Sequence, residues 1–172
     1  MKITTIAAAL AAMSLVACQT VPDEPALANA GLAATQGNRT FGEATFEQVG
    51  SKVRVIVFVQ GLKPNQEHGM HIHEGTACGP DGMAAAGHFN PGGKPHGAHT
   101  DANRHAGDLP SLKAGRDGRA KIDVEVDGLS IGSGAANIIG RTLVVHADPD
   151  DFKTQPTGNS GARIACAVIK AG

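Results

Sequence analysis

The sequence predicts an all-β domain, an antiparallel sandwich or barrel, and three observations lead to this fold class. Several short stretches alternate apolar and polar residues with a period of two. Turns rich in Gly and Pro, which number 23 and 9 in the 172 residues, separate these stretches. The domain shows no convincing run with the helical period of 3.6 residues. A chain of this length builds one hydrophobic core, so we expect a single domain.

The chain begins with a segment that reads as an export signal. Residues 3–16 are apolar, follow a lysine and are too short to cross a bilayer comfortably. The run ends in Leu15-Val16-Ala17-Cys18, which resembles a bacterial lipobox; the alternative is an ordinary signal peptide with a chance cysteine. We expect residues 1–17 to be a lipoprotein signal peptide, cleaved before a lipid-modified Cys18. The residue after this cysteine is Gln19, whereas an Asp there would favour the inner membrane. We therefore expect a periplasmic protein anchored to the outer membrane.

Residues 18–38 are predicted to be a flexible tether. They are rich in Ala, Pro, Asn and Gly and show neither the helical nor the strand period. At about 5 to 6 Å times the square root of its length, such a tether spans on the order of 25 Å. The folded domain is therefore expected to comprise residues 39–172 and to stand clear of the lipid.

Two stretches predict strands most clearly. Every second residue from Val53 to Val59 is a valine, which predicts a strand over residues 51–60. Residues 120–127 alternate apolar with charged side chains and follow a turn-like Arg-Asp-Gly. Weaker patterns predict four further strands, at residues 40–48, 70–73, 141–146 and 163–170.

A long segment between two of these strands has almost no periodic pattern. It covers about 45 residues, 74–118, and loops of that length in a small domain are either functional or disordered. The segment carries Cys78, Asp108 and four histidines, which are His88, His96, His99 and His105. We therefore expect metal ions and a cross-link to order it.

Composition excludes one class of function and limits another. The formal net charge of −1 and a charged fraction of 18% leave no basic surface that would neutralise phosphates, so nucleic-acid binding is excluded. Aromatic residues make up only 3%, with no Trp and no Tyr, which removes most protein-binding anchors. The 8 histidines point instead to metal chemistry.

The three cysteines are predicted to have two different roles, lipid attachment and a disulfide bond. With Cys18 assigned to lipid, Cys78 and Cys166 remain as a pair that an oxidising compartment would join. Two buried free thiols are the alternative. A disulfide there would close a loop of about 88 residues and contribute roughly 4 to 5 kcal/mol in the chain-entropy model.

The histidines fall into patterns typical of metal ligands. His71 and His73 would point to the same face of a strand, although an H-x-H pair alone also fits a polar sheet face. His146 ends an apolar run, where a core or capping role is the alternative. His96, His105 and Asp108 follow the spacing H-x8-H-x2-D, and a carboxylate with imidazoles suits tetrahedral Zn(II).

Together these residues offer more ligands than one four-coordinate ion uses. The candidates are His71, His73, His88, His96, His105, Asp108 and His146. Two metals are therefore implied, because a mostly imidazole set suits Cu(II) and a set with a carboxylate suits Zn(II). One imidazole has two nitrogens and would serve both ions.

Five motifs, in this order, resemble those of the copper/zinc superoxide dismutases. They are Gly69-Met70-His71-Ile72-His73-Glu74, Gly87-His88-Phe89-Asn90-Pro91, the stretch from His96 to Asp108, Gly140-Arg141-Thr142-Leu143-Val144-Val145-His146, and Gly161-Ala162-Arg163-Ile164-Ala165-Cys166. The resemblance covers about residues 40–170, and the leader makes the chain similar to the bacterial, exported branch. It implies a Greek-key β-sandwich or barrel with a long metal-binding loop. Residues 147–161 resemble a shortened form of the family's electrostatic loop.

The resemblance also implies a role for each candidate. The copper ligands would be His71, His73, His88 and His146. The zinc ligands would be His88, His96, His105 and Asp108, with His88 as the shared imidazolate. Asp150 would link a copper and a zinc histidine, Arg163 would attract the substrate beside copper, and Cys78 and Cys166 would form the family disulfide. His68, His99 and Glu74 are expected outside the metal shell.

The activity implied is that of a superoxide dismutase, which would protect the cell envelope from oxidative damage. Cu(II)/Cu(I) cycling beside a structural zinc would convert superoxide to oxygen and hydrogen peroxide. His88 would release reduced copper and carry a proton, while Arg163 supplies a permanent positive charge. The rivals are a metal-carrying lipoprotein, which needs exchangeable sites, and a zinc hydrolase, whose open position Asp108 would close. The sequence leaves both a monomer and a homodimer open.

Overall fold

Alternating burial along the strands gives the sheet one face that forms the core. The structure is a computed structural model that describes residues 25–172, so the predicted signal peptide and Cys18 lie outside the described residues. The strands are β1 (Leu27–Ala34), β2 (Phe41–Val49), β3 (Lys52–Gln60), β4 (Glu67–His68), β5 (Met70–His73), β6 (Leu112–Lys113), β7 (Ala120–Val126), β8 (Thr142–His146), β9 (Arg163–Val168) and β10 (Lys170–Ala171). A short 3-10 turn, Met83–Ala85, interrupts the long loop.

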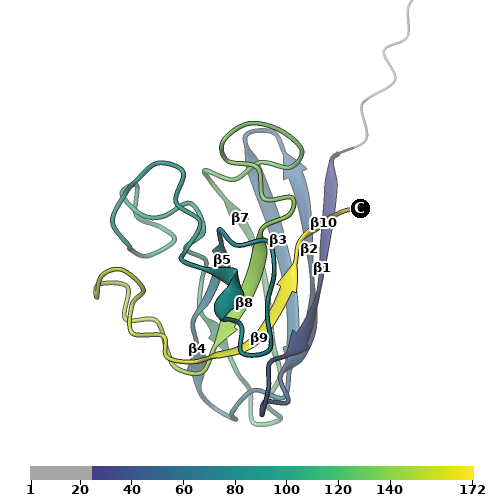
Figure 1. Ribbon diagram of the computed structural model, residues 1–172, viewed down its shortest axis with the longest axis vertical. Helices are drawn as coiled ribbons and strands as arrows, with labels where there is room; N and C mark the ends of the chain where they lie inside the picture. The colour runs from purple at the N-terminus through teal and green to yellow at the C-terminus, as the bar shows by residue number, and fades with distance from the viewer. Residues whose placement is uncertain (1–24) are drawn as a thin grey trace, which may run out of the picture.

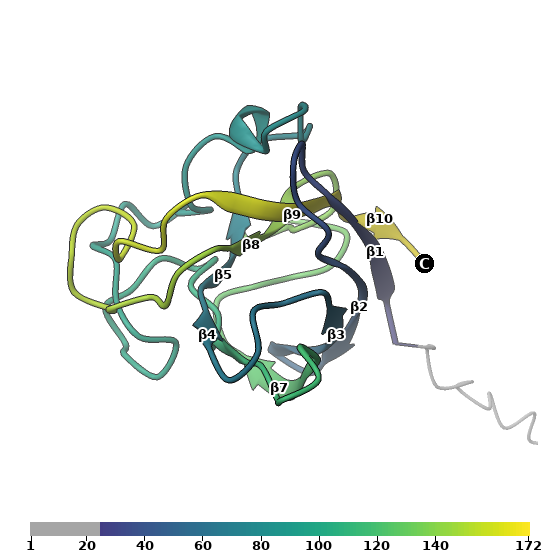
Figure 2. The ribbon, with the colours of Figure 1, turned by 90° about the horizontal axis from the view of Figure 1, so that it is seen from below.

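The strands form one antiparallel sheet that curls on itself. Its order is β5-β8-β9-β1-β2-β3-β7, with β10 beside β1, and β4 and β6 make a separate ribbon. Figure 1 shows the strands side by side, and Figure 2 shows the sheet curving round from β7 to β5. Strand β9, which comes near the end of the chain, lies beside β1, the first strand of the β1-β2-β3 meander. This is the strand order of a Greek key. The all-β, antiparallel prediction is confirmed.

The core lies inside the curl and is built from apolar side chains of both ends of the sheet. Each of the four valines of β3 from Val53 to Val59 is fully buried, and Val55 lies opposite the buried Phe46 of β2. Met70 and Ile72 of β5 and Leu143 of β8 belong to the same cluster. Burial of these side chains removes apolar surface from water, which is the main force that closes the sheet. Among residues 25–172, no helix has the length and apolar character needed to cross a membrane.

The prediction of a tether up to residue 38 is wrong for Leu27–Ala34, which form β1. Ala28, Ala30 and Leu32 alternate inward and are buried, and β1 pairs with β2 on one edge and with β9 and β10 on the other. The reason for the error is composition: alanine, asparagine and glycine give almost no hydropathy contrast between the two faces of a strand. The folded domain therefore includes Leu27, and β1 completes the centre of the sheet.

Candidate metal centre

Strand β5 is the scaffold of the site. It pairs with β8 through one edge, with His71 opposite Val144 and His73 opposite Thr142. The long loop pairs with its other edge, where isolated bridges join His71 to Asp108 and His73 to His88. The loop can lie this close because residue 107 is Gly: a Cβ there would stand 2.2 Å from the carbonyl oxygen of Ile72. Backbone pairing thus brings distant parts of the chain beside β5.

The first group consists of four buried imidazoles whose nitrogens lie within 4.8 Å of one another. Its members are His71, His73, His88 and His146. The Nε2 atoms of His73 and His146 are 3.3 Å apart, and the rings of His71 and His88 stack with centroids 3.9 Å apart. β8 places His146 at its end, where the pairing with β9 shifts register.

Hydrogen bonds on the outer side of these rings decide which nitrogen faces inward. His73 Nδ1 donates to the carbonyl of Ala86 (3.0 Å), and His146 Nδ1 donates to that of Gly161 (3.2 Å). His71 Nε2 donates to Asp150 Oδ2 (2.7 Å), and the other ring nitrogen of His71, Nδ1, is buried without a partner. Each ring therefore turns an unprotonated nitrogen toward the centre, and a buried cation would satisfy these lone pairs.

Burial keeps three imidazoles of the first group, those of His71, His73 and His146, in their neutral form. It lowers the pKa of His71 to about 4 and that of His146 to about 3, and it holds the pKa of His73 well below its usual value. A neutral imidazole is the form that binds a metal ion, whereas a protonated one repels it. Near neutral pH these histidines need no deprotonation before they bind copper or another soft or borderline cation.

The second group is a compact set of three imidazoles and one carboxylate: His88, His96, His105 and Asp108. Asp108 Oδ1 lies 2.9, 3.0 and 3.3 Å from the Nδ1 atoms of the three histidines, and the Nδ1 atoms of His88 and His105 are 3.4 Å apart. In a tetrahedral zinc shell with ligands at about 2.0 to 2.1 Å, neighbouring donor atoms are about 3.3 Å apart. The donor atoms of this group are thus spaced as zinc requires.

The carboxylate of Asp108 is fixed before any metal binds. Its Oδ2 accepts the main-chain N–H groups of Gly97 (3.1 Å) and His105 (3.0 Å), which turns Oδ1 toward the three histidines. Burial raises the pKa of Asp108, but hydrogen bonds from His88 and His96 outweigh it and hold the pKa far below the usual range. Asp108 therefore stays ionised and supplies a negative charge that favours a divalent cation.

One ring belongs to both groups. His88 Nδ1 faces the second group, 2.9 Å from Asp108 Oδ1, while its Nε2 is buried without a partner on the side of the first group. The backbone bridge between His73 and His88 places the main chain of His88 beside β5, and the hydrogen bond to Asp108 orients its ring. A single imidazole is thus placed to touch two different cations through its two nitrogens.

Asp150 joins the two groups from outside. Its Oδ2 accepts His71 Nε2 at 2.7 Å, and its Oδ1 accepts His96 Nε2 at 2.9 Å. Gly158 permits this contact, because a Cβ at that position would stand 1.8 Å from Asp150 Oδ1. One carboxylate therefore orients one histidine of each group.

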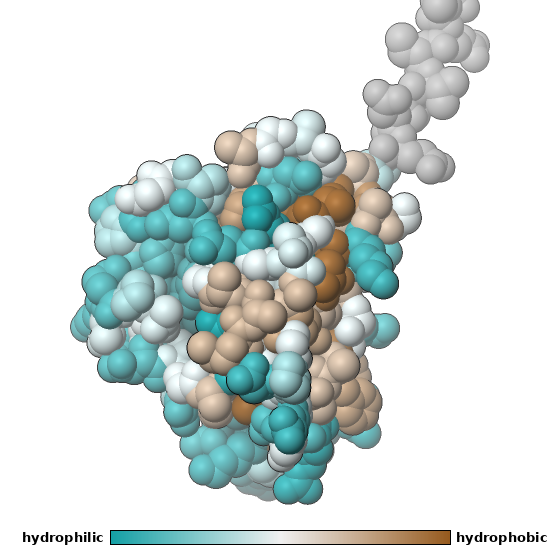
Figure 3. All heavy atoms as spheres, viewed as in Figure 1, coloured by the Kyte–Doolittle hydropathy of each residue, from teal (hydrophilic) through white to brown (hydrophobic). Residues whose placement is uncertain are grey.

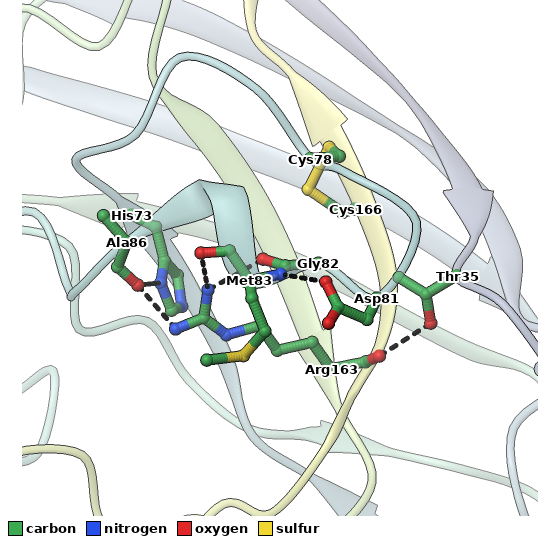
Figure 4. The surroundings of a disulfide bond; sticks show 9 residues. All are labelled: Thr35, His73, Cys78, Asp81, Gly82, Met83, Ala86, Arg163 and Cys166. Carbon is green, nitrogen blue, oxygen red and sulfur yellow. Dashed lines mark hydrogen bonds between the residues drawn. A yellow bond between two sulfur atoms is a disulfide. The ribbon is translucent and has the colours of Figure 1, made fainter.

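Arg163 lies near His73 of the first group, and both side chains point to the carbonyl of Ala86 (Figure 4). A hollow of about 400 Å³ is lined there by His73, His146, Arg163, Met83 and neighbouring residues of the loop before β9. The guanidinium donates to the carbonyls of Gly82 (2.7 Å) and Ala86, and the latter also accepts from His73. A small anion entering the hollow would therefore meet a fixed positive charge beside the imidazoles.

A disulfide fastens the segment that holds this arginine. Cys78 and Cys166, 88 residues apart in sequence, are bonded and join the long loop to β9 (Figure 4). The same loop segment provides the Gly82 and Ala86 carbonyls that hold the guanidinium of Arg163. The disulfide predicted from cysteine counting is present.

The remaining candidates lie outside both groups. The carbonyl of His99 accepts from Arg104, and its ring joins neither group. His68 is buried, and its Nδ1 donates to the carbonyl of His146 at 2.9 Å, so it supports the end of β8. Glu74 is exposed, and its carbonyl accepts from Arg141. Sequence reasoning missed Ala86 and Gln155, because a main-chain carbonyl and a single glutamine carry no recognisable pattern.

The family model and the curated relatives indicate the same family. The family model described as copper/zinc superoxide dismutase (SODC) matches residues 40–169. The chain is 42% identical to a "Superoxide dismutase [Cu-Zn]" of Paramecium bursaria Chlorella virus 1 over 134 residues, 74% of this chain and 71% of the relative. It is 40% identical over 150 residues to the protein of the same name from Deinococcus radiodurans, covering 79% of this chain and 80% of the relative.

Two solved structures have a similar fold. The clock protein EA4 is 36% identical with a TM-score of 0.77, and the match covers 88% of this chain and 98% of that one. A double mutant of a SOD-like protein from Bacillus subtilis is 34% identical with a TM-score of 0.74, covering 81% and 95%.

Proposed function

The chain belongs to the copper/zinc superoxide dismutase family, and on this premise we propose how its two groups of side chains divide the two metals. It is an oxidoreductase that converts two superoxide anions and two protons to oxygen and hydrogen peroxide, with copper and zinc as cofactors. Copper is held by His71, His73, His88 and His146. Zinc is held by His88, His96, His105 and Asp108. The observation that carries this assignment is that His88 is the single member common to both groups.

The donor atoms of each group support the division. Four imidazoles gathered around one point suit copper, and three imidazoles with a carboxylate at tetrahedral spacing suit zinc. Copper, when bound, supplies the one-electron redox chemistry that zinc lacks. A hydrolytic role is disfavoured, because Asp108 occupies the position that a hydrolytic zinc site keeps for water.

The protein's own residues attract the anion and supply a proton. Arg163 keeps its charge at any working pH and faces the hollow beside His73 and His146. His88 Nε2 has no protein partner, so it is the atom that holds a proton and passes it to the reduced oxygen species when it is not a ligand. Its Nδ1 stays anchored in the second group throughout.

Metal titration tests the division. The purified metal-free protein is given zinc or copper in turn, and superoxide loss is measured after each addition. We expect no activity with zinc alone and activity once copper is added. Activity with zinc alone, or none with copper, would contradict the assignment.

A charge reversal tests the role of Arg163. Arg163→Glu is expected to retain both metals, to slow the reaction and to invert its dependence on ionic strength, because attraction becomes repulsion. Arg39→Glu is the matched control, since it makes the same change in net charge at an exposed position away from the hollow. Equal kinetics for the wild type and Arg163→Glu would remove the steering role.

We further propose that the enzyme acts in the cell envelope as a lipid-anchored periplasmic protein. The apolar run and lipobox-like motif before Cys18 support export and lipidation, and the Cys78–Cys166 disulfide is typical of an oxidising compartment. Radiolabelled palmitate should enter the wild type but not Cys18→Ser, and fractionation should place the label in the outer membrane. A labelled Cys18→Ser variant would refute the anchor. Sedimentation of the mature protein would distinguish a monomer from a homodimer.

A further inference from the structure

Gln155, in the loop between β8 and β9, makes two hydrogen bonds to the main chain of His96. Its Oε1 accepts the His96 N–H at 2.8 Å, and its Nε2 donates to the His96 carbonyl at 2.9 Å. A glutamine amide has an acceptor and a donor side by side, so it pairs with a residue as a neighbouring strand does. His96 lies outside any strand, and this pairing fixes its main chain.

The same loop also fixes the His96 ring. Asp150 Oδ1 accepts His96 Nε2 at 2.9 Å. Gly158 leaves room for this contact, because a Cβ there would stand 1.8 Å from Asp150 Oδ1 and 2.6 Å from His96 Nε2. His96 is therefore held at its N–H, its carbonyl and its Nε2 by residues 150–158. Its Nδ1 remains, and this atom faces Asp108 Oδ1 at 3.0 Å.

The loop is itself stiffened by internal hydrogen bonds. The carboxylate of Asp151 accepts the N–H groups of Lys153 and Thr154, the Thr154 hydroxyl and the Asn159 amide. Asp151 N–H also donates to the Gly158 carbonyl at 2.9 Å. Gln155 projects from this self-bonded turn, so the turn restricts where the amide can lie. Support from a rigid base is what gives a supporting residue control over a ligand's position.

We propose that Gln155 is a positioning residue for the zinc site, which sets the place and direction of His96 Nδ1. This inference rests on the proposed zinc assignment of His96 and goes beyond it, because Gln155 touches no metal. Removing an outer partner of a metal ligand lowers metal affinity by about 10- to 100-fold. Loss of the Gln155 amide is therefore expected to weaken zinc binding within that range. The copper ligands keep their own hydrogen bonds, apart from the link through Asp150.

Gln48 offers a matched control within the same chain. Its Oε1 accepts Ile131 N–H at 2.9 Å, and its Nε2 donates to the carbonyls of Gly50 (2.9 Å) and Lys52 (3.0 Å). It is the same kind of amide clamp on main-chain groups, but it lies among β2, β3 and the loop after β7, and none of its partners is a candidate ligand. Gln48→Ala thus measures the general cost of losing such a clamp.

The experiment uses the full mature protein freed of metal. Zinc affinity is measured by competition with a chromophoric chelator, and Co(II) placed in the zinc site reports ligand geometry through its visible absorption bands. Gln155→Ala is expected to lower zinc affinity about 10- to 100-fold and to shift the Co(II) bands. Gln155→Glu should behave similarly, because a carboxylate cannot donate to the His96 carbonyl. Gln48→Ala should change neither readout.

Two results would overturn the proposal. One is a Gln155→Ala protein with wild-type zinc affinity and Co(II) bands while His96→Ala loses affinity. The other is equal loss in Gln155→Ala and Gln48→Ala, which would show only a general effect on stability. If His96→Ala itself leaves zinc affinity unchanged, the zinc assignment fails first, and the positioning role fails with it.

Discussion

The two sides of the molecule bury different kinds of side chain. On the side of β1, β2, β3 and β7 the buried residues are almost all apolar, as with Phe46 and the valines of β3. On the side of β5, β8 and the two long loops, buried histidines and carboxylates crowd together, and the outer surface of these loops is largely hydrophilic (Figure 3). Apolar burial stabilises the first side without help, whereas the second leaves His71 Nδ1 and His88 Nε2 without protein partners. The apolar side is therefore stable through its own packing, whereas bound metal ions complete the contacts of the other side.

The largest expected effect on stability comes from the apolar side. Phe46 is fully buried in the core, so Phe46→Ala should lower the free energy of unfolding by about 3 to 5 kcal/mol. Chemical denaturation of the metal-loaded protein measures this. The copper absorption spectrum of the folded fraction should not change, and a changed spectrum would show that the two sides are not separable.

A substitution on the metal side should have the opposite result, a large loss of activity with a smaller loss of stability. His88→Ala removes the ring common to both groups, so activity should fall by more than about 100-fold, the upper limit for losing only an outer partner. The metal-free variant should be destabilised less than Phe46→Ala, because it loses the buried hydrogen bond to Asp108 but no contact of the apolar core. Activity within tenfold of wild type would contradict the shared role of His88.

The metal-free protein should be most stable near pH 6.5. Burial lowers the pKa of His71 to about 4 and that of His146 to about 3, so the stability they contribute above pH 6.5 is lost as the pH falls through these values. Burial also acts to lower the pKa of His96, but hydrogen bonds to Asp108 and Asp150 outweigh it and raise the pKa to about 9. That contribution is present below pH 6.5 and disappears as the pH rises through about 9. Thermal unfolding from pH 3 to 10 tests this, and a flat profile would contradict it.

The smallest effect is expected at the exposed face of the sheet. Arg54 on β3 forms two hydrogen bonds of 2.8 Å with Asp123 on β7, and both side chains are substantially exposed. Arg54→Met should therefore lower the free energy of unfolding only slightly, and by less at high salt. Denaturation at two ionic strengths measures the effect. A cost as large as that of Phe46→Ala would mean that surface charge, rather than apolar burial, stabilises this side.

The sequence predicts the apolar side where hydropathy alternates strongly. The valines of β3 and the charged alternation of β7 make these strands evident to within a residue or two. β1 was missed because its buried positions are mostly alanines, and β4 and β6 because two residues show no period. A strand can thus be predicted only where its two faces differ strongly in hydropathy. The folded structure does not need such a difference, because alanines can also fill a buried face.

The metal side was predictable for a different reason. Ligand side chains such as His71 and His73 occur at recognisable spacings. The resemblance of these motifs to one family then predicts the remaining ligands. What holds the ligands in place is less visible: the carbonyl of Ala86, the main chain of His96 and the amide of Gln155 depend on the folded path of the loops. Sequence patterns identify donor atoms, but the contacts that orient them appear only in the structure.

The most direct test of the account is a crystal of the enzyme loaded with both metals, measured at the copper and zinc absorption edges. We expect a copper peak among His71, His73, His88 and His146. We also expect a separate zinc peak among His88, His96, His105 and Asp108, with the His88 ring between the two ions. A single kind of ion in both places, or a His88 ring in contact with only one ion of the oxidised enzyme, would contradict it.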